Sequence, residues 1–130
     1  MSEPAYALQK AVVVALKGAG VCAGRVYDRV PTPVTFPFVQ IGNDSFSEAY
    51  DLGADFTECD VTVHVYSRAV GKPELKTITS AVRAALDQAL SLDSFAMAEA
   101  RFTGSRYFTD PDGLTEHAVL TFEYLVQPLA

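Results

Sequence analysis

His64 and His117 are the two histidines of the chain, and each lies in a segment with strand-like patterning. Because histidine titrates near neutral pH, two that meet in the fold can act as an acid/base pair or ligate a metal ion. A catalytic zinc site generally needs three protein ligands, and the sequence has neither a His-x-x-x-His nor a Cys-x-x-Cys pair. A nucleophilic pair with Cys59 would require that side chain to leave the apolar face of its strand. We therefore favour solvated or interface histidines, and we expect no metal and no cofactor.

The segment Gly18-Ala19-Gly20-Val21-Cys22-Ala23 has the glycine spacing of a dinucleotide-binding fingerprint. That site requires a strand before the glycines and a helix after them. Here a helical pattern precedes the glycines and a short strand follows, so a helix end and a turn are the better interpretation. The two cysteines, Cys22 and Cys59, are too few for a disulfide scaffold, and we expect them to be free core thiols.

A polar segment at residues 43–55 is rich in Ser, Asp and Gly and has no clear periodicity. We interpret it as a long loop or a loose hairpin, and a loop of this length is generally functional. Its carboxylates do not follow EF-hand spacing, so a solvated loop is favoured over a calcium site. Aromatic side chains among the acids predict either a binding edge or a lid that folds back onto the sheet. The candidate partner-binding residues are Asp44, Phe46, Glu48, Tyr50, Asp51 and Leu52.

Composition narrows the class of protein. A chain of 130 residues is long enough for one domain with its own core, so we expect a single domain over residues 1–130. Lys plus Arg is 10 against 16 for Asp plus Glu, a net charge of −6, which disfavours a freestanding nucleic-acid binder and adhesion to an anionic membrane. The acidic start, Met1-Ser2-Glu3-Pro4, does not match a signal peptide. We therefore expect a cytoplasmic, reduced protein.

Hydrophobic spacing predicts two helices. The first has its apolar face at Leu8, Val12, Ala15 and Leu16 and ends at Gly18 and Gly20. The second starts near Lys72, with Pro73 in its first turn. Its apolar stripe consists of Leu75, Ile78, Val82, Ala85, Leu86 and Ala89.

Strands are predicted at residues 25–30, 36–42, 57–67, 96–110 and 114–127. The third alternates strictly, with Cys59, Val61, Val63 and Val65 on one side, which predicts a sheet with one dry and one wet face. Pro111-Asp112-Gly113 predicts a hairpin turn between the last two strands. The order α-β-β-β-α-β-β predicts an α+β fold, a mainly antiparallel sheet with two helices packed on one face.

Several short motifs follow one another along the chain, and their order and spacing are more specific than any one of them. They are Leu8-Gln9-Lys10-Ala11, Gly24-Arg25-Val26-Tyr27-Asp28-Arg29-Val30-Pro31, Phe36-Pro37-Phe38-Val39-Gln40-Ile41-Gly42, Val61-Thr62-Val63-His64-Val65-Tyr66-Ser67-Arg68, Arg106-Tyr107-Phe108-Thr109-Asp110-Pro111-Asp112-Gly113 and His117-Ala118-Val119-Leu120. Together they cover nearly the whole chain. In this order the chain resembles the tail-completion or tail-terminator proteins of long-tailed bacteriophages, which also occur in prophages and gene transfer agents.

The resemblance implies a structural virion protein without enzymatic activity. Such proteins form a ring, typically a hexamer, on the head-proximal end of the tail tube, where the ring stops tube elongation and joins the tail to the head connector. The implied partners are further copies of the chain, the tail tube protein and the head–tail connector protein, with DNA passing through without specific binding. The implied location is the bacterial cytoplasm during assembly and then the head–tail junction of a virion or virus-like particle.

Two alternatives stay open at this point. One is a small ligand-binding or hydrolytic α+β domain that uses His64 and His117. The other is a neighbouring head–tail connector subunit or a minor tail subunit.

Overall fold

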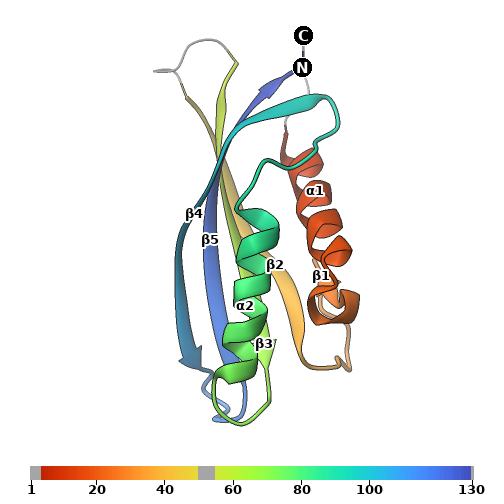
Figure 1. Ribbon diagram of the computed structural model, residues 1–130, viewed down its shortest axis with the longest axis vertical. Helices are drawn as coiled ribbons and strands as arrows, with labels where there is room; N and C mark the ends of the chain where they lie inside the picture. The colour runs from red at the N-terminus through yellow and green to blue at the C-terminus, as the bar shows by residue number, and fades with distance from the viewer. Residues whose placement is uncertain (1–3, 50–54, 130) are drawn as a thin grey trace.

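The structure is a computed structural model in which residues 4–49 and 55–129 are described. Within them, two helices pack on one face of a five-stranded sheet (Figure 1). The strand order is β1-β2-β3-β5-β4, with β1 parallel to β2 and the other pairs antiparallel, which confirms the predicted α+β fold. The elements are α1 (Ala5–Gly18), the 3-10 helix η1 (Val21–Gly24), β1 (Val26–Tyr27), β2 (Phe38–Glu48), β3 (Thr57–Ser67), α2 (Pro73–Leu86), β4 (Phe95–Thr109) and β5 (Glu116–Pro128).

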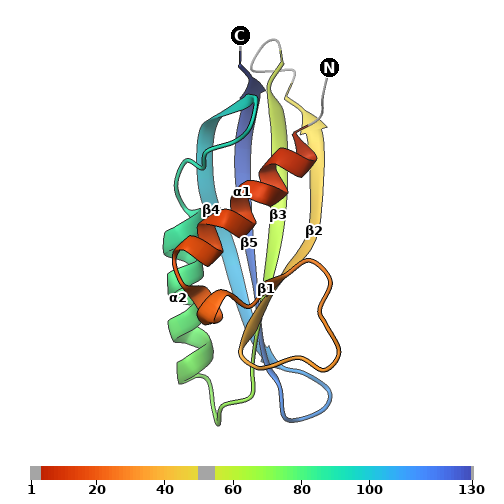
Figure 2. The same cartoon turned by 90° about the vertical axis from the view of Figure 1, so that its right-hand side faces the viewer.

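The core lies between the helices and the sheet face beneath them, which we call the covered face (Figure 2). The alternation predicted for β3 is confirmed, since Val63 and Val65 are completely buried there. In β5 the side chains on the same face are equally buried, including Phe122 and Tyr124. The opposite face of the sheet, which we call the open face, carries the polar positions of the same strands.

The apolar stripe of α2 is confirmed at Leu75, Val82 and Leu86, but its predicted end was wrong. The helix ends at Leu86, so Ala89 lies beyond it and is exposed. Thr79, which was not predicted to lie on the apolar face, is also buried. It can be buried because its hydroxyl donates a hydrogen bond of 3.0 Å to the Lys76 carbonyl inside the helix.

The prediction of a loop over residues 43–55 was wrong at its start. Strand β2 continues through this segment to Glu48, and residues 44–48 pair with residues 57–61 of β3, so the hairpin interpretation holds for this part. The register shifts between Ile41 and Asp44. This bulge interrupts the two-residue period, which is why the sequence pattern did not reveal the strand.

The first predicted strand, residues 25–30, was too long, because β1 is a two-residue edge that pairs only with Val39 and Gln40. Strand β2 starts directly after Pro37, which has no N–H to donate to a ladder. At the other end of the sheet the predicted turn is confirmed. There Asp112 accepts hydrogen bonds from the backbone N–H groups of Leu114 and Thr115, each at 2.9 Å.

Candidate functional site

Three of the predicted partner-binding residues lie on strand β2 of the β2–β3 hairpin, and they differ in exposure. Asp44 and Glu48 are exposed on β2, as a binding edge requires. Phe46, between them, is partly buried against the core and pairs with Cys59, so it packs back onto the sheet. The remaining three candidates, Tyr50, Asp51 and Leu52, lie outside the described residues.

The two histidines meet on the open face of the sheet. His117 Nδ1 lies 2.9 Å from Asp110 Oδ1, and His117 Nε2 lies 2.8 Å from His64 Nδ1. An ionised carboxylate only accepts hydrogen bonds, so His117 donates from Nδ1 to Asp110 and accepts at Nε2 from His64 Nδ1–H. The basic nitrogen that remains is Nε2 of His64. Burial lowers the pKa of His64, and the neighbouring His117 and Arg106 lower it further, while Asp110 opposes them.

This arrangement does not form the nucleophilic pair considered from the sequence. In a hydrolytic triad a carboxylate holds one nitrogen of a histidine, and the nucleophile lies at the other nitrogen. Here Asp110 holds Nδ1 of His117, but Nε2 of His117 faces the imidazole of His64 and not a nucleophile. Cys59 is buried on the covered face, on the other side of the sheet. Among residues 4–49 and 55–129, no group of three His, Cys, Asp or Glu side chains could hold a metal ion.

His117 also belongs to a row of rings that crosses all five strands, which we call the aromatic row. Neighbouring ring centroids along it are 6.1, 4.8, 4.3 and 4.6 Å apart. The row consists of Tyr27 on β1, Phe38 on β2, Tyr66 on β3, His117 on β5 and Phe108 on β4. Sequence reasoning did not find it, because the alignment of these rings depends on strand order and register.

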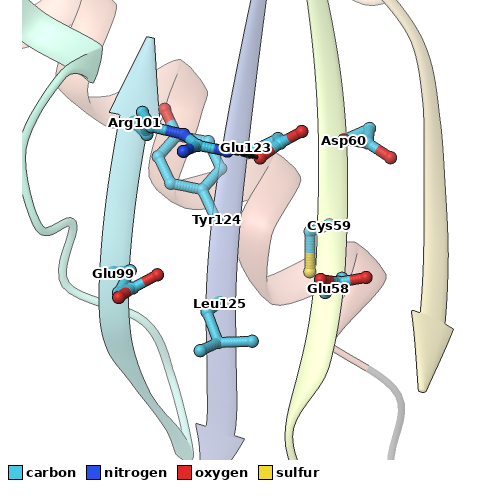
Figure 3. Close-up of a pocket in the computed structure, with 8 residues that line it drawn as sticks. All are labelled: Glu58, Cys59, Asp60, Glu99, Arg101, Glu123, Tyr124 and Leu125. Carbon is cyan, nitrogen blue, oxygen red and sulfur yellow. Dashed lines mark hydrogen bonds and ion pairs between the residues drawn. The ribbon is translucent and has the colours of Figure 1, made fainter. Parts of the chain in front are cut away.

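The other half of the open face, toward the β2–β3 hairpin, carries an acidic cluster around one arginine (Figure 3). Arg101 forms an ion pair with Glu123, and three further carboxylates line the same shallow pocket. The cluster consists of Glu58 and Asp60 from β3, Glu99 and Arg101 from β4, and Glu123 from β5. In the sequence Glu58 and Asp60 follow the acidic segment at residues 43–55, whereas Glu99, Arg101 and Glu123 join them only through strand order and register.

Neither cysteine forms a disulfide, and both are buried, so the prediction that they lie in the core is confirmed. Burial raises the pKa of the Cys22 thiol to about 11, so it stays protonated and unreactive near neutral pH. The glycine segment is the end of α1 followed by η1, as the interpretation of a helix end and a turn predicted. In the part of the chain that the structure describes, no helix is long and apolar enough to cross a membrane.

Comparison with known proteins identifies the family. None of the curated proteins gives a significant match. A chain from the virion of a native gene transfer agent particle has 25% identity and a TM-score of 0.86, and the match covers 98% of this chain and 99% of that one. The gp17 protein of bacteriophage SPP1 has the same fold, with 24% identity, a TM-score of 0.55, and coverage of 96% and 90%. The model of the tail completion protein gp17 family matches residues 5–127, so the chain belongs to that family, as the order of its motifs indicated.

Proposed function

We propose that this chain forms a ring on the head-proximal end of a tail tube, stops tube elongation there and joins the tail to the head connector. The observation that carries this proposal is the match to a chain of a gene transfer agent virion, which accounts for nearly the full length of both chains. Every element of the fold therefore has a counterpart in a protein of an assembled particle. Membership of the tail completion family supports the same role.

The free edges of the sheet support a ring. A ring needs head-to-tail contacts between two different surfaces of the subunit. Strand β4 pairs with β5 on one side, and β2 pairs with β1 only through Val39 and Gln40, so both margins of the sheet have backbone groups that can accept a strand or loop. On β4, Asp87 already accepts the N–H of Phe102 at 3.0 Å. The margin of β2 beyond Gln40 is therefore the more open one, and we assign it to the subunit contact.

The two ends of the molecule differ, as expected for a component between two different partners. At one end the β2–β3 hairpin presents Asp44 and Glu48, and we propose that this end, with Tyr50, Asp51 and Leu52, binds a partner. At the other end Val70 and Leu114 are 100% and 67% exposed. They project from two turns that are held together by Arg68–Asp112 and Lys72–Glu116 ion pairs at 3.6 and 2.9 Å.. We propose the tail tube protein and the head connector as the two partners.

In this role the protein acts without catalysis, metal or cofactor. It would assemble in the bacterial cytoplasm and then stay at the head–tail junction, with DNA passing through the ring. A hydrolytic or ligand-binding domain would use the two histidines. Here Asp110 orients His117 toward the imidazole of His64 and not toward a nucleophile. This geometry supports the structural role over the enzymatic alternative.

Light scattering on a sizing column, with and without tail tube protein, tests the ring. Six copies of the 14.0 kDa chain give a mass of about 84 kDa, which we expect for the free ring or for the material released from tube ends. A neighbouring connector subunit would bind the head connector without changing tube length.

Charge reversal at Asp44 and Glu48 tests the hairpin end, and we expect assembly to fail while the fold is kept. Normal tails from that double variant would contradict the assignment of this end.

A further inference from the structure

A groove on the open face lies between the acidic cluster and the aromatic row. Its volume is about 460 Å³, and it is open to solvent. The polar side chains along it come from four strands and include a guanidinium, an imidazole, an amide and hydroxyls, and no carboxylate is among the described residues that line it. The lining residues are Asn43, Thr62, His64, Gly104, Ser105, Arg106, Val119 and Thr121. We call this the polar groove.

The polar groove has a positive side. Arg106 stacks over the ring of Phe108 with its guanidinium carbon 5.5 Å from the centroid, whereas Arg68, Arg83 and Arg101 each have a carboxylate partner. Arg106 is close enough to His64 to disfavour a second positive charge there. An anion placed between these two side chains would remove that repulsion and gain charge-assisted hydrogen bonds from both.

The histidine pair prepares His64 for this contact. Asp110 holds His117, and His117 in turn fixes the Nδ1–H of His64, which leaves Nε2 as the nitrogen that can take up a proton. Glycine at position 42 makes room for the ring, because a Cβ there would lie 2.7 Å from Cδ2 and Nε2 of His64. The groove floor is open at Gly104, where a Cβ would meet only Thr121 Oγ1, at 3.9 Å.

We propose that the polar groove binds a phosphate oxyanion between Arg106 and His64, with Thr62 as a further hydroxyl contact, and that the oxyanion is a phosphodiester of DNA. The choice of DNA over free phosphate rests on the proposed position in a DNA-conducting tail. A contact to one backbone phosphate carries no sequence information, so it fits passage of any DNA sequence. Asp60 lies two residues from Thr62 on β3, and Glu123 lies two residues from Thr121 on β5. The negative charges of these two carboxylates oppose binding of the anion. We therefore expect weak binding that lets DNA move.

The first experiment titrates inorganic phosphate into the protein and follows the side-chain NMR signals of His64 and Arg106. We expect both to shift at millimolar phosphate, and the Arg106→Gln variant to lose the His64 shift. The matched control is Arg101→Gln, on the same strand and face and with the same change in net charge, but among carboxylates. Equal responses of the two variants would show a net-charge effect and would overturn the site, as would unshifted signals in the unmodified protein.

The second experiment identifies the source of the phosphate by fluorescence anisotropy of a short labelled DNA duplex. Because Arg106→Gln loses one charge-assisted contact, we expect it to bind the duplex roughly tenfold more weakly than the unmodified protein. For Arg101→Gln we expect a clearly smaller loss of duplex affinity. Phosphate shifts without duplex binding would remove DNA as the ligand and leave a free phosphate. Because Arg106 lies outside the proposed assembly contacts, Arg106→Gln should still form the ring, which separates failure of the groove from failure of the proposed function.

Binding should also depend on pH. The groups that face His64 are His117 from β5, Asp110 from the β4–β5 turn, Arg106 from β4 and Tyr66 from its own strand. A bound phosphate favours the protonated imidazole, so duplex affinity should rise as the pH falls toward the lowered pKa of His64. The His64→Gln variant should lack this rise. A rise of the same size in that variant would overturn the role of His64.

Discussion

The two faces of the sheet show how differently one set of strands can be used. On the covered face the side chains of β3 and β5 are mostly apolar, buried and held by packing against the helices. On the open face the alternate residues of the same strands form an acidic cluster, a polar groove and an aromatic row. The covered face therefore sets the stability of the fold, while the open face can vary its chemistry at small cost to folding. Partner and ligand contacts are expected on the open face, at the sheet margins and at the two ends.

The largest loss of stability is expected on the covered face. Leu120 is 1% exposed at the centre of β5, so Leu120→Ala removes buried methyl groups and leaves a cavity that the neighbouring side chains cannot fill. We expect the free energy of unfolding to fall by about 2–5 kcal/mol, measured by urea denaturation. A loss as small as that of Thr121→Ala, its neighbour on the open face, would contradict the distinction between the faces.

A smaller loss is expected where the covered face holds a polar group. Tyr124 is 2% exposed, and its hydroxyl donates a hydrogen bond of 2.8 Å to the carbonyl of Leu86 at the end of α2. Tyr124→Phe removes the donor and leaves that carbonyl without this partner, so we expect a loss of about 1–2 kcal/mol in the same denaturation experiment. An unchanged midpoint would show that the bond does not tie α2 to the sheet.

On the open face the expected effect depends on pH. Burial, His117 and Arg106 lower the pKa of His64 in the folded state, so the unfolded chain binds a proton first as the pH falls. The contribution to stability is complete above the ordinary pKa of histidine and is lost as the pH falls toward the lowered value. In thermal melts recorded over this pH range, the melting temperature of His64→Gln should fall less steeply with decreasing pH than that of the unmodified protein. A decline of equal steepness in the variant would assign it to other groups.

The smallest effect is expected at the acidic cluster. The side chains of Arg101 and Glu123 are 71% and 47% exposed, and ion pairs at such sites contribute little to folding because water screens them. Arg101→Gln should therefore leave the melting temperature nearly unchanged. A large drop would mean that the cluster contributes to the fold, and that the open face is less independent of folding than we infer.

The sequence was most informative where one physical rule dominated. Strict alternation from Cys59 to Val65 identified β3, and the helical stripe at Leu75, Val82 and Leu86 identified α2, because burial against one face imposes those periods. The turn at Asp112 followed from local chemistry in the same way. Such features need no knowledge of which strands are neighbours.

The candidate sites were harder to predict from the sequence, because they depend on which strands are neighbours. The bulge between Ile41 and Asp44 hid the second half of β2, so residues 43–55 were interpreted as a long loop or a loose hairpin and the strand was not predicted beyond Gly42. The two histidines were singled out, but their contact depends on β3 and β5 being adjacent, and Asp110 joins them from a turn. The polar groove needs four strands in register, which hydrophobic periodicity does not provide.

Polymerisation of the tail tube protein in the presence of this chain tests the central claim most directly. We expect electron microscopy to show shorter tubes with a ring-shaped density at one end, and tube length to fall as more of the protein is added. Tubes of unchanged length, with no density at either end at any ratio of the two proteins, would contradict the proposed role.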